Sequence, residues 1–290
     1  MSASNLSVAR SLARASWTLR RFGLTPGGVL SRLRERGAPR VLCVCIPKAG
    51  THLLERALCL HPALYRKLVG TVNDTNLSER NGLPSLLDGL RSGQVLMSHL
   101  RFSAERRDTI ESKGVRCLFL VRDPRDIVVS LAMYISRNRR HAFHDIFRDK
   151  PDLKDRLRLT IEGDPARQFP SMGERLRMFA GWLHSDCCVV RFEDLVGWWG
   201  GGSVSKQLET LHSTFGHLGV DQSEELVASV GERLFSAVSP TFRKGRIGEW
   251  RRYFDTETTD RFMEVAGDCM ASYGYSLVDN RTEPALLTTT

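Results

Sequence analysis

Short apolar runs alternate along the chain with longer segments in which apolar and polar residues mix. Runs of mostly apolar, β-favouring residues bounded by polar residues, glycine or proline predict strands. Apolar residues that recur every three to four positions predict amphipathic helices. The predicted strands are residues 41–46, 94–99, 116–121 and 187–192. The predicted helices are residues 51–60, 103–113, 124–137, 171–185, 204–217, 222–235 and 257–271.

Continuous apolar strands separated by helices indicate a parallel sheet covered by helices on both faces, so the predicted fold class is α/β. In such sheets ligands bind beyond the carboxyl ends of the strands. The residues that follow the predicted strands are therefore the first candidates for a functional site. They are residues 47–51, His99, residues 122–125 and residues 193–194.

Composition shifts divide the chain into three parts: a basic leader over residues 1–39, one domain over 40–275 and a flexible tail over 276–290. Residues 1–40, the leader together with Arg40, hold eight arginines and one acid, Glu35, and therefore +7 of the net charge of +9. The rest of the chain is close to neutral, so it does not resemble a general polyanion binder. The leader fits an organellar transit peptide or a basic surface helix, and both readings stay open.

The seven cysteines include no C-x-x-C pair, which argues against a zinc site and favours buried, reduced thiols. No apolar stretch approaches the ~20 residues that a membrane span needs, so no stable membrane insertion is expected. The predicted location is cytoplasmic, with an organelle as the alternative.

The stretch CVCIPKAGTHLLERAL, residues 43–58, resembles a phosphate loop in which the lysine precedes the glycine. The nucleoside-triphosphate loop has its lysine after the second glycine. Backbone N–H groups of Ala49, Gly50, Thr51 and His52 would face an anion above the helix start, and Lys48 adds a charge. The alternative is an ordinary strand–helix turn capped by Thr51.

Three other features add candidates. Arg122 and Ser130 could clamp a phosphate, although Arg122 could instead pair with Asp126. His99, after its strand, is either catalytic or structural. The segment FRKGRIGEW, residues 242–250, contains Arg243, Lys244 and Gly245, which could wrap a phosphate or form an ordinary basic surface.

These pieces, in this order, resemble the family of sulfotransferases that depend on 3′-phosphoadenosine 5′-phosphosulfate (PAPS), over about residues 40–272. The family signature Pro-Lys-Ser-Gly-Thr appears as residues 47–51. Arg-x-Pro-x-Asp with a later serine appears as residues 122–126 and Ser130. Arg-Lys-Gly-x-x-Gly-Asp-Trp appears as residues 243–250, and the family histidine matches His99.

The resemblance implies a P-loop-like fold and transfer of a sulfuryl group to a hydroxyl or amine. It implies His99 as general base, Lys48 on the leaving phosphate, and no metal. The implied donor ligands are Lys48, Ala49, Gly50, Thr51 and His52 at the 5′-phosphosulfate, and Arg122, Ser130, Arg243, Lys244 and Gly245 at the 3′-phosphate. The expected acceptor is a small molecule or carbohydrate, with no nucleic acid as partner.

Four positions depart from the family pattern: Leu53 replaces a tryptophan, Phe192 a tyrosine, Met97 a lysine and Glu249 an aspartate. Adenine must then be held differently, and Phe235 is a candidate. Acceptor contacts are expected from the variable segments 65–92, 137–170 and 197–204, of which 137–158 is either a lid, an anion dock or a solvated helix and loop. No dimerisation motif is evident, so the oligomeric state stays open.

Two rival functions remain. A small-molecule kinase would bind ATP more tightly than the desulfated donor, but the loop is not of the kinase type. A non-catalytic polyanion or RNA binder would depend on the arginine-rich leader and would lose binding when residues 1–40 are removed.

Overall fold

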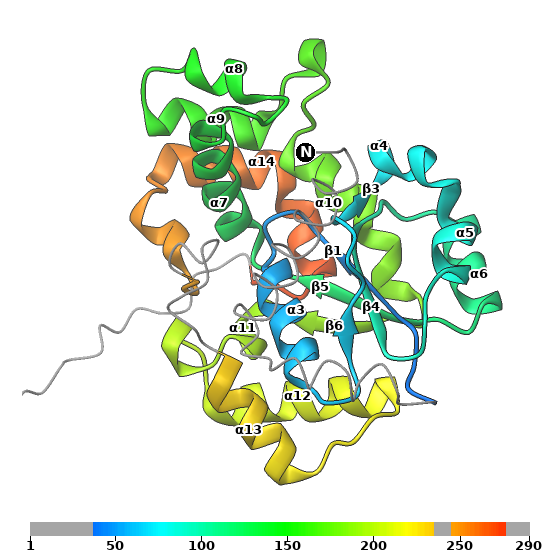
Figure 1. Ribbon diagram of the computed structural model, residues 1–290. Helices are drawn as coiled ribbons and strands as arrows, with labels where there is room; N and C mark the ends of the chain where they lie inside the picture. The colour runs from blue at the N-terminus through cyan, green and yellow to red at the C-terminus, as the bar shows by residue number, and fades with distance from the viewer. Residues whose placement is uncertain (1–36, 235–244, 277–290) are drawn as a thin grey trace, which may run out of the picture. The chain divides into compact units, whose positions relative to one another are not determined.

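The computed structural model describes residues 37–234 and 245–276, and these form two compact units (Figure 1). One unit comprises the described residues up to Arg122 together with those of Gly181–Gly248. The other comprises Asp123–Ala180 and the described residues from Glu249 onward. Most of the predicted leader and tail, the residues 1–36 and 277–290, lie outside the described residues.

The first unit is built on a parallel sheet with the strand order β2-β4-β1-β5-β6, and β3 also pairs with β4. The strands are β1 (Val41–Cys45), β2 (Tyr65–Arg66), β3 (Val72–Asn73), β4 (Gln94–His99), β5 (Arg116–Val121) and β6 (Cys188–Arg191). The predicted strands are all present. The short β2 and β3 lie in a segment predicted only as a variable loop.

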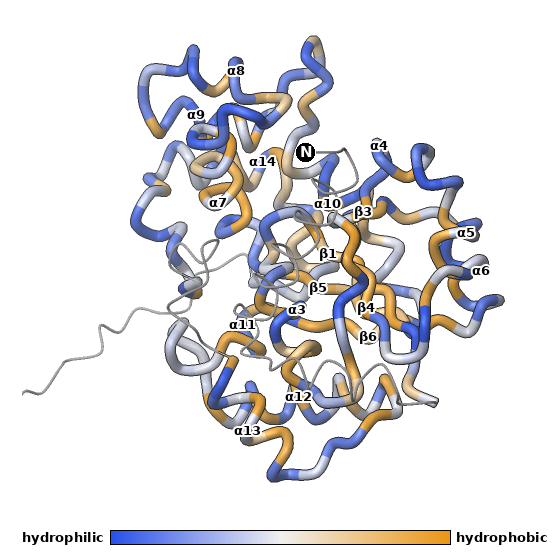
Figure 2. Tube along the Cα trace, viewed as in Figure 1, coloured by the Kyte–Doolittle hydropathy of each residue, from blue (hydrophilic) through white to orange (hydrophobic). Residues whose placement is uncertain are grey.

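Both faces of the sheet are covered. Each residue of β1 is 0% exposed, although successive side chains of a strand point to opposite faces. Figure 2 shows the matching hydrophobic colour along β1, β4 and β5. The helices α3 (Thr51–Leu60), α6 (Ala104–Ser112) and α12 (Val204–Leu218) contact the strands. The predicted parallel α/β fold class is confirmed.

Further helices and turns complete the first unit. They are α4 (Asp74–Leu77), α5 (Gly82–Asp88), α11 (Phe192–Leu195) and α13 (Glu224–Leu234), with the 3₁₀ turns η1 (Ser78–Arg80), η3 (Gly181–His184) and η4 (Trp198–Gly200). The predicted helix over 171–185 is wrong in its last turn, because α10 ends at Ala180 and η3 replaces it.

The second unit is helical. Its elements are α7 (Pro124–Arg137), α8 (His144–Arg148), α9 (Leu153–Glu162), η2 (Pro165–Arg167), α10 (Met172–Ala180), η5 (Glu249–Arg252) and α14 (Thr256–Ser272). Helix α9 buries Leu157 and Ile161 and contacts α7 and α14. The segment 137–158 therefore combines helices with loops, and part of it belongs to the core of this unit.

The cysteines differ from the prediction at two positions. Cys117 and Cys187 form a disulfide, whereas Cys43, Cys45, Cys59, Cys188 and Cys269 are free. The expectation of reduced thiols throughout is therefore wrong for this pair. Strands β5 and β6 pair in parallel, which brings the two Cα atoms to 4.6 Å across 70 residues of sequence.

Within residues 37–234 and 245–276, no helix has both the length and the apolar character that crossing a bilayer requires.

Candidate active site

The loop between β1 and α3 has an unusual backbone. Lys48 has φ 73° and Gly50 has φ 109°, so two residues of this short loop adopt left-handed conformation. Gly50 is the N-cap of α3, and no described side chain hydrogen-bonds to cap this end. The N–H of Leu53 donates to the Gly50 carbonyl oxygen at 2.8 Å. The N–H groups of Thr51 and His52 come before this bond, in the first turn, where a helix offers its amides to an anion.

Gly50 cannot be replaced without movement. A Cβ atom built on it would lie 2.5 Å from Cδ2 of Phe192, and its φ is one that residues with side chains rarely adopt. Lys48 differs from Gly50, because a lysine in left-handed conformation carries backbone strain that a glycine does not. Strain of this kind gathers at functional sites. The loop is therefore held in a shape that its own local preferences do not favour.

His99 is the last residue of β4, and its ring is oriented by the neighbouring strand. Nδ1 lies 2.8 Å from the carbonyl oxygen of Cys45. Because a carbonyl can only accept, Nδ1 carries the proton and Nε2 keeps a lone pair. Burial lowers the pKa of His99; the bond to Cys45 opposes this, while the charges of His52 and Lys48 lower it further. A neutral imidazole with a basic Nε2 is the form that a general base requires.

Arg122 follows β5 and is 8% exposed. The carbon at the centre of its guanidinium lies 4.2 Å from the centroid of the Phe192 ring, and Nη2 donates to the carbonyl oxygen of Arg246 at 2.9 Å. Phe192 thus contacts both Arg122 and the Gly50 position of the loop. The motif at residues 122–126 and the motif at residues 243–250 are therefore in contact through Arg122 and Arg246.

The described part of the motif at residues 243–250 begins at Gly245, which has φ 53°. The N–H of Ile247 donates to the carbonyl oxygen of Gly200 at 2.9 Å. Gly200 belongs to the predicted variable segment 197–204, which therefore makes a backbone contact with this motif, although Trp198 is 57% exposed. Arg243 and Lys244, both predicted donor ligands, lie outside the described residues, as does Phe235.

Ser130, the remaining predicted donor ligand, is half-buried on α7 in the second unit. Helix α7 begins as its sequence predicts, with the side chain of Asp123 accepting from the N–H of Arg125 and Pro124 in the first turn. The carboxylate of Asp126 accepts from the N–H of Trp250 at 2.9 Å. Within this unit the motif residues Asp126 and Trp250 therefore have a structural contact.

Sequence reasoning missed a carboxylate beside the loop. Glu55, on α3, is 1% exposed; its Oε2 lies 3.2 Å from Nδ1 of His52 and its Oε1 lies 2.7 Å from Nη1 of Arg66. The helical spacing of His52 and Glu55 was a usable signal. The contribution of Arg66, on β2, was not, because β2 is too short to predict.

Lys48, His99 and Arg122 each follow or end one of three adjacent strands, β1, β4 and β5. Parallel strands end at the same edge of a sheet, so these three side chains come from one edge. Among the described residues no group of three or more His, Cys, Asp or Glu side chains could hold a metal ion. The edge instead offers cations, backbone amides and one neutral histidine, which is a set suited to a phosphorylated or sulfated anion.

The chain was compared with known proteins. No model of a protein family matches it. A curated protein, the 3-alpha-hydroxysteroid sulfotransferase of Cavia porcellus, is 23% identical over 258 residues, which cover 80% of this chain and 84% of the relative.

Solved structures of proteins bound to PAP have a fold similar to that of this chain. Mouse sulfotransferase SULT7A1 complexed with PAP aligns with a TM-score of 0.56 and 18% identity, over 83% of this chain and 90% of that one. Retinol dehydratase in complex with androsterone and inactive cofactor PAP aligns with a TM-score of 0.53 and 17% identity, over 80% of both chains. The resemblance in sequence and fold that the motifs predict is confirmed, and so is the predicted class of enzyme.

Proposed function

We propose that this chain, which belongs by sequence and fold with the sulfotransferases, transfers the sulfuryl group of PAPS to a hydroxyl or amine of a small-molecule acceptor. The observation that carries the proposal is the convergence of Lys48, His99 and Arg122 at one edge of the sheet. A point charge, a base and an anion clamp are the parts that sulfuryl transfer needs.

The donor would bind through its two phosphate-bearing ends. The amides of Gly50, Thr51 and His52 would hold the 5′-phosphosulfate, because they lie at the start of α3. The predicted amide of Ala49 is instead used within the loop, where it donates to the carbonyl oxygen of Ile46 at 3.0 Å. Arg122 would bind the 3′-phosphate, with Gly245 and the predicted ligands Ser130, Arg243 and Lys244. Phe192 supports both ends, since it contacts Arg122 and lies against Gly50. No metal is required for this arrangement.

The chemistry would run in one displacement. Nε2 of His99 takes the proton of the acceptor hydroxyl or amine, and the acceptor oxygen or nitrogen attacks the sulfur. The bond between sulfur and the bridging oxygen breaks, and 3′-phosphoadenosine 5′-phosphate (PAP) leaves. Lys48 stabilises the negative charge that builds on this oxygen. The bond from His99 to Cys45 keeps the base in its productive tautomer.

The acceptor class follows from the relatives and is the least specified part of the proposal. The Cavia porcellus protein is named for 3-alpha-hydroxysteroids, and the retinol dehydratase structure contains androsterone. Hydroxysteroids are therefore the first acceptors to try, followed by phenols, amines and simple sugars. The cytoplasmic location also remains a prediction.

The test is acceptor-dependent release of PAP from PAPS, with the sulfated product identified by mass spectrometry. We expect turnover with at least one hydroxylated acceptor and a loss of about 10²–10³-fold in kcat in Lys48→Ala. Lys206→Ala, at an exposed position of α12, is the control and should keep full activity. Release of PAP at the same rate without any acceptor, or equal rates in Lys48→Ala, would contradict the proposal.

A further inference from the structure

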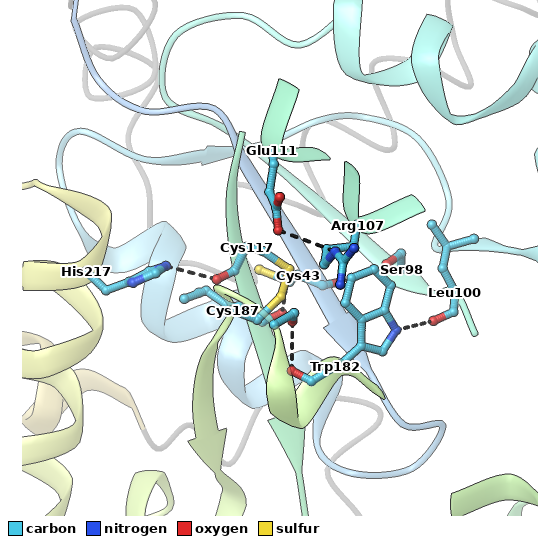
Figure 3. The surroundings of a disulfide bond; sticks show 11 residues. Cys43, Ser98, Leu100, Arg107, Glu111, Cys117, Trp182, Cys187 and His217 are labelled. Carbon is cyan, nitrogen blue, oxygen red and sulfur yellow. Dashed lines mark hydrogen bonds and ion pairs between the residues drawn. A yellow bond between two sulfur atoms is a disulfide. The ribbon is translucent and has the colours of Figure 1, made fainter. Parts of the chain in front are cut away.

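A cavity of about 380 Å³ lies beside the Cys117–Cys187 disulfide. Figure 3 shows the side chains that surround this disulfide. Both cysteines line it, together with Trp182 of η3 and His217 of α12. Cys187 is half-buried, whereas Cys117 is 6% exposed. A molecule in the cavity can therefore reach the disulfide, and Cys187 is the more exposed of the two residues.

The walls of this cavity carry both signs of charge. Arg107, Arg116, Glu111 and Asp186 all line it. Arg107 is paired with Asp108 at 2.8 Å, and its Nε lies 3.8 Å from Glu111. The volume falls within the roughly 300–1,000 Å³ of ordinary small-molecule sites. A small ligand that itself carries both charges suits such walls best.

No other cysteine of the sheet can resolve this disulfide. Leu118 aligns with Cys43 of β1 and with Cys188 of β6, so these three side chains share one face. Side chains alternate along a strand, so Cys117 points to the opposite face. The free thiols of Cys43 and Cys188 are therefore on the wrong side of the sheet, and a thiol that opens the bond must come from outside.

We propose that this cavity is a thiol–disulfide exchange site for a small zwitterionic thiol of the cysteinyl-peptide class, and that opening the bond weakens the donor site. The incoming thiol loses its proton to water, and its thiolate attacks Sγ of Cys187. The bond between the two cysteine sulfurs breaks, Cys117 leaves as a thiolate and takes up a proton, and a mixed disulfide forms on Cys187. A second thiolate then releases Cys187 and carries away the oxidised small molecule.

The coupling to the donor site runs along two strands, and this half of the inference rests on the proposed function. The disulfide joins the amino ends of β5 and β6, which pair from Leu118 with Cys188 to Val121 with Arg191. The next residues are Arg122 and Phe192, whose guanidinium and ring lie 4.2 Å apart. Opening the disulfide frees the amino ends of the two strands whose carboxyl ends hold this pair.

The predicted cytoplasmic location supports an exchange role for this disulfide, because persistent disulfides are rare in that reducing compartment. Those that occur there are commonly redox-responsive.

The first experiment measures exchange on the folded full-length protein, purified without reductant. Reduced glutathione is the zwitterionic probe and 2-mercaptoethanol the neutral probe, with rates expressed per thiolate and adducts located by peptide mass spectrometry. We expect a mixed disulfide at Cys187, formed about tenfold faster with glutathione. Arg116→Gln should remove most of that preference and leave the neutral probe unaffected. Equal rates for both probes, or a first adduct at another cysteine, would overturn the proposal.

Neighbouring cysteines provide the matched controls. Cys188→Ser should leave the exchange unchanged, because residue 188 points to the other face of the sheet, whereas Cys187→Ser should abolish it. Reduced Cys117 and Cys187 in protein purified and alkylated without reductant would also refute the site.

The second experiment compares PAP affinity before and after exchange by calorimetry. We expect the Kd to rise roughly fivefold or more when the bond opens. An unchanged Kd refutes the coupling. If PAP fails to bind in both states while exchange proceeds at Cys187, the proposed function fails and the exchange site stands.

Discussion

Two left-handed residues shape the loop after β1, and Gly50 is the one whose replacement has a calculable steric effect. Its absent side chain leaves room for the ring of Phe192, which in turn lies against Arg122. The loop, the ring and the arginine therefore depend on one another. A substitution of Gly50 should therefore disturb both the loop after β1 and the position of Arg122, the two ends of the proposed donor site.

Gly50→Ala should destabilise the protein by about 1–3 kcal/mol, because it adds strain at φ 109° and a contact at 2.5 Å. PAP binding should weaken at least about tenfold. Gly37→Ala is the matched control, since Gly37 has φ 103° with nothing within 4 Å of its built Cβ. Thermal unfolding and calorimetry measure both effects. If the two variants behave alike, the packing of Phe192 on the loop is unimportant.

His99 carries the pH dependence of the reaction. The neutral form is the base, so activity is present above the pKa of His99 and is lost as the pH falls through it. Because burial lowers that pKa, the acid limb of kcat/KM should lie below the ordinary histidine value of 6.5.

His99→Gln should reduce kcat/KM about 10²–10⁴-fold while PAP affinity changes little, because the imidazole acts on the acceptor. His212→Gln, at an exposed position of α12, serves as the control. Steady-state rates are measured from about pH 5 to about pH 9, a range that brackets the pKa of ~6.5 of free histidine. They give both the pH dependence of kcat/KM and its reduction in His99→Gln. An acid limb above 6.5 would show that another group is titrating.

Lys48, His99 and Arg122 could be predicted because each stands where an apolar strand stops, and that edge is where parallel sheets bind ligands. The contact of Glu55 with Arg66 could not, since it joins α3 to a strand of two residues. The role of Phe192 beside Gly50 also needed the structure, because the two are far apart in sequence.

Among the elements, the long strands followed from their continuous apolar runs and the long helices from their periodicity, whereas the short elements showed neither signal. Strands β4 and β5 and helices α3 and α7 have the predicted bounds. Strands β2 and β3 have two residues each, too few to show alternation. The disulfide could not be predicted for a related reason. Apolar runs indicate where strands lie but not which strands pair, and the pairing of β5 with β6 is what brings Cys117 and Cys187 together.

Helices α10 and α14 of the second unit approach closely at a glycine. A Cβ on Gly173 would lie 2.1 Å from the backbone carbonyl oxygen of Val265, and backbone cannot yield as a side chain can. Gly267 of α14 differs, because the nearest atom is the terminal methyl of Met263 at 2.9 Å.

Gly173→Ala should therefore lower the stability of the protein by about 1–3 kcal/mol. Gly267→Ala should stay within about 1 kcal/mol of the wild type, since alanine favours the helix and Met263 can move. Urea denaturation followed by circular dichroism distinguishes them. Equal stability of the two variants would mean that α10 and α14 are not in close contact in solution.

For the whole molecule, the distribution of charge separates donor binding from general anion binding. Residues 1–36 contain seven arginines and one acid, while the loop, His99 and Arg122 all lie beyond them. The rival function, polyanion binding, depends on this arginine-rich segment, whereas the proposed binding of the sulfotransferase donor does not.

Removal of residues 1–36 should leave the Kd for PAP within about twofold, because none of the proposed donor ligands is lost. The same truncation should weaken binding to heparin, which serves as the polyanion control. Loss of PAP binding with the leader would favour the rival function.

The most direct measurement of the central claim is a calorimetric titration of the full chain with PAP, using 5′-AMP and ATP as controls. The account predicts micromolar binding of PAP, at least about 100-fold weaker binding of AMP, and a Kd for PAP raised about tenfold or more in Arg122→Ala. PAP binding no tighter than AMP binding, or ATP binding tighter than both, would contradict it.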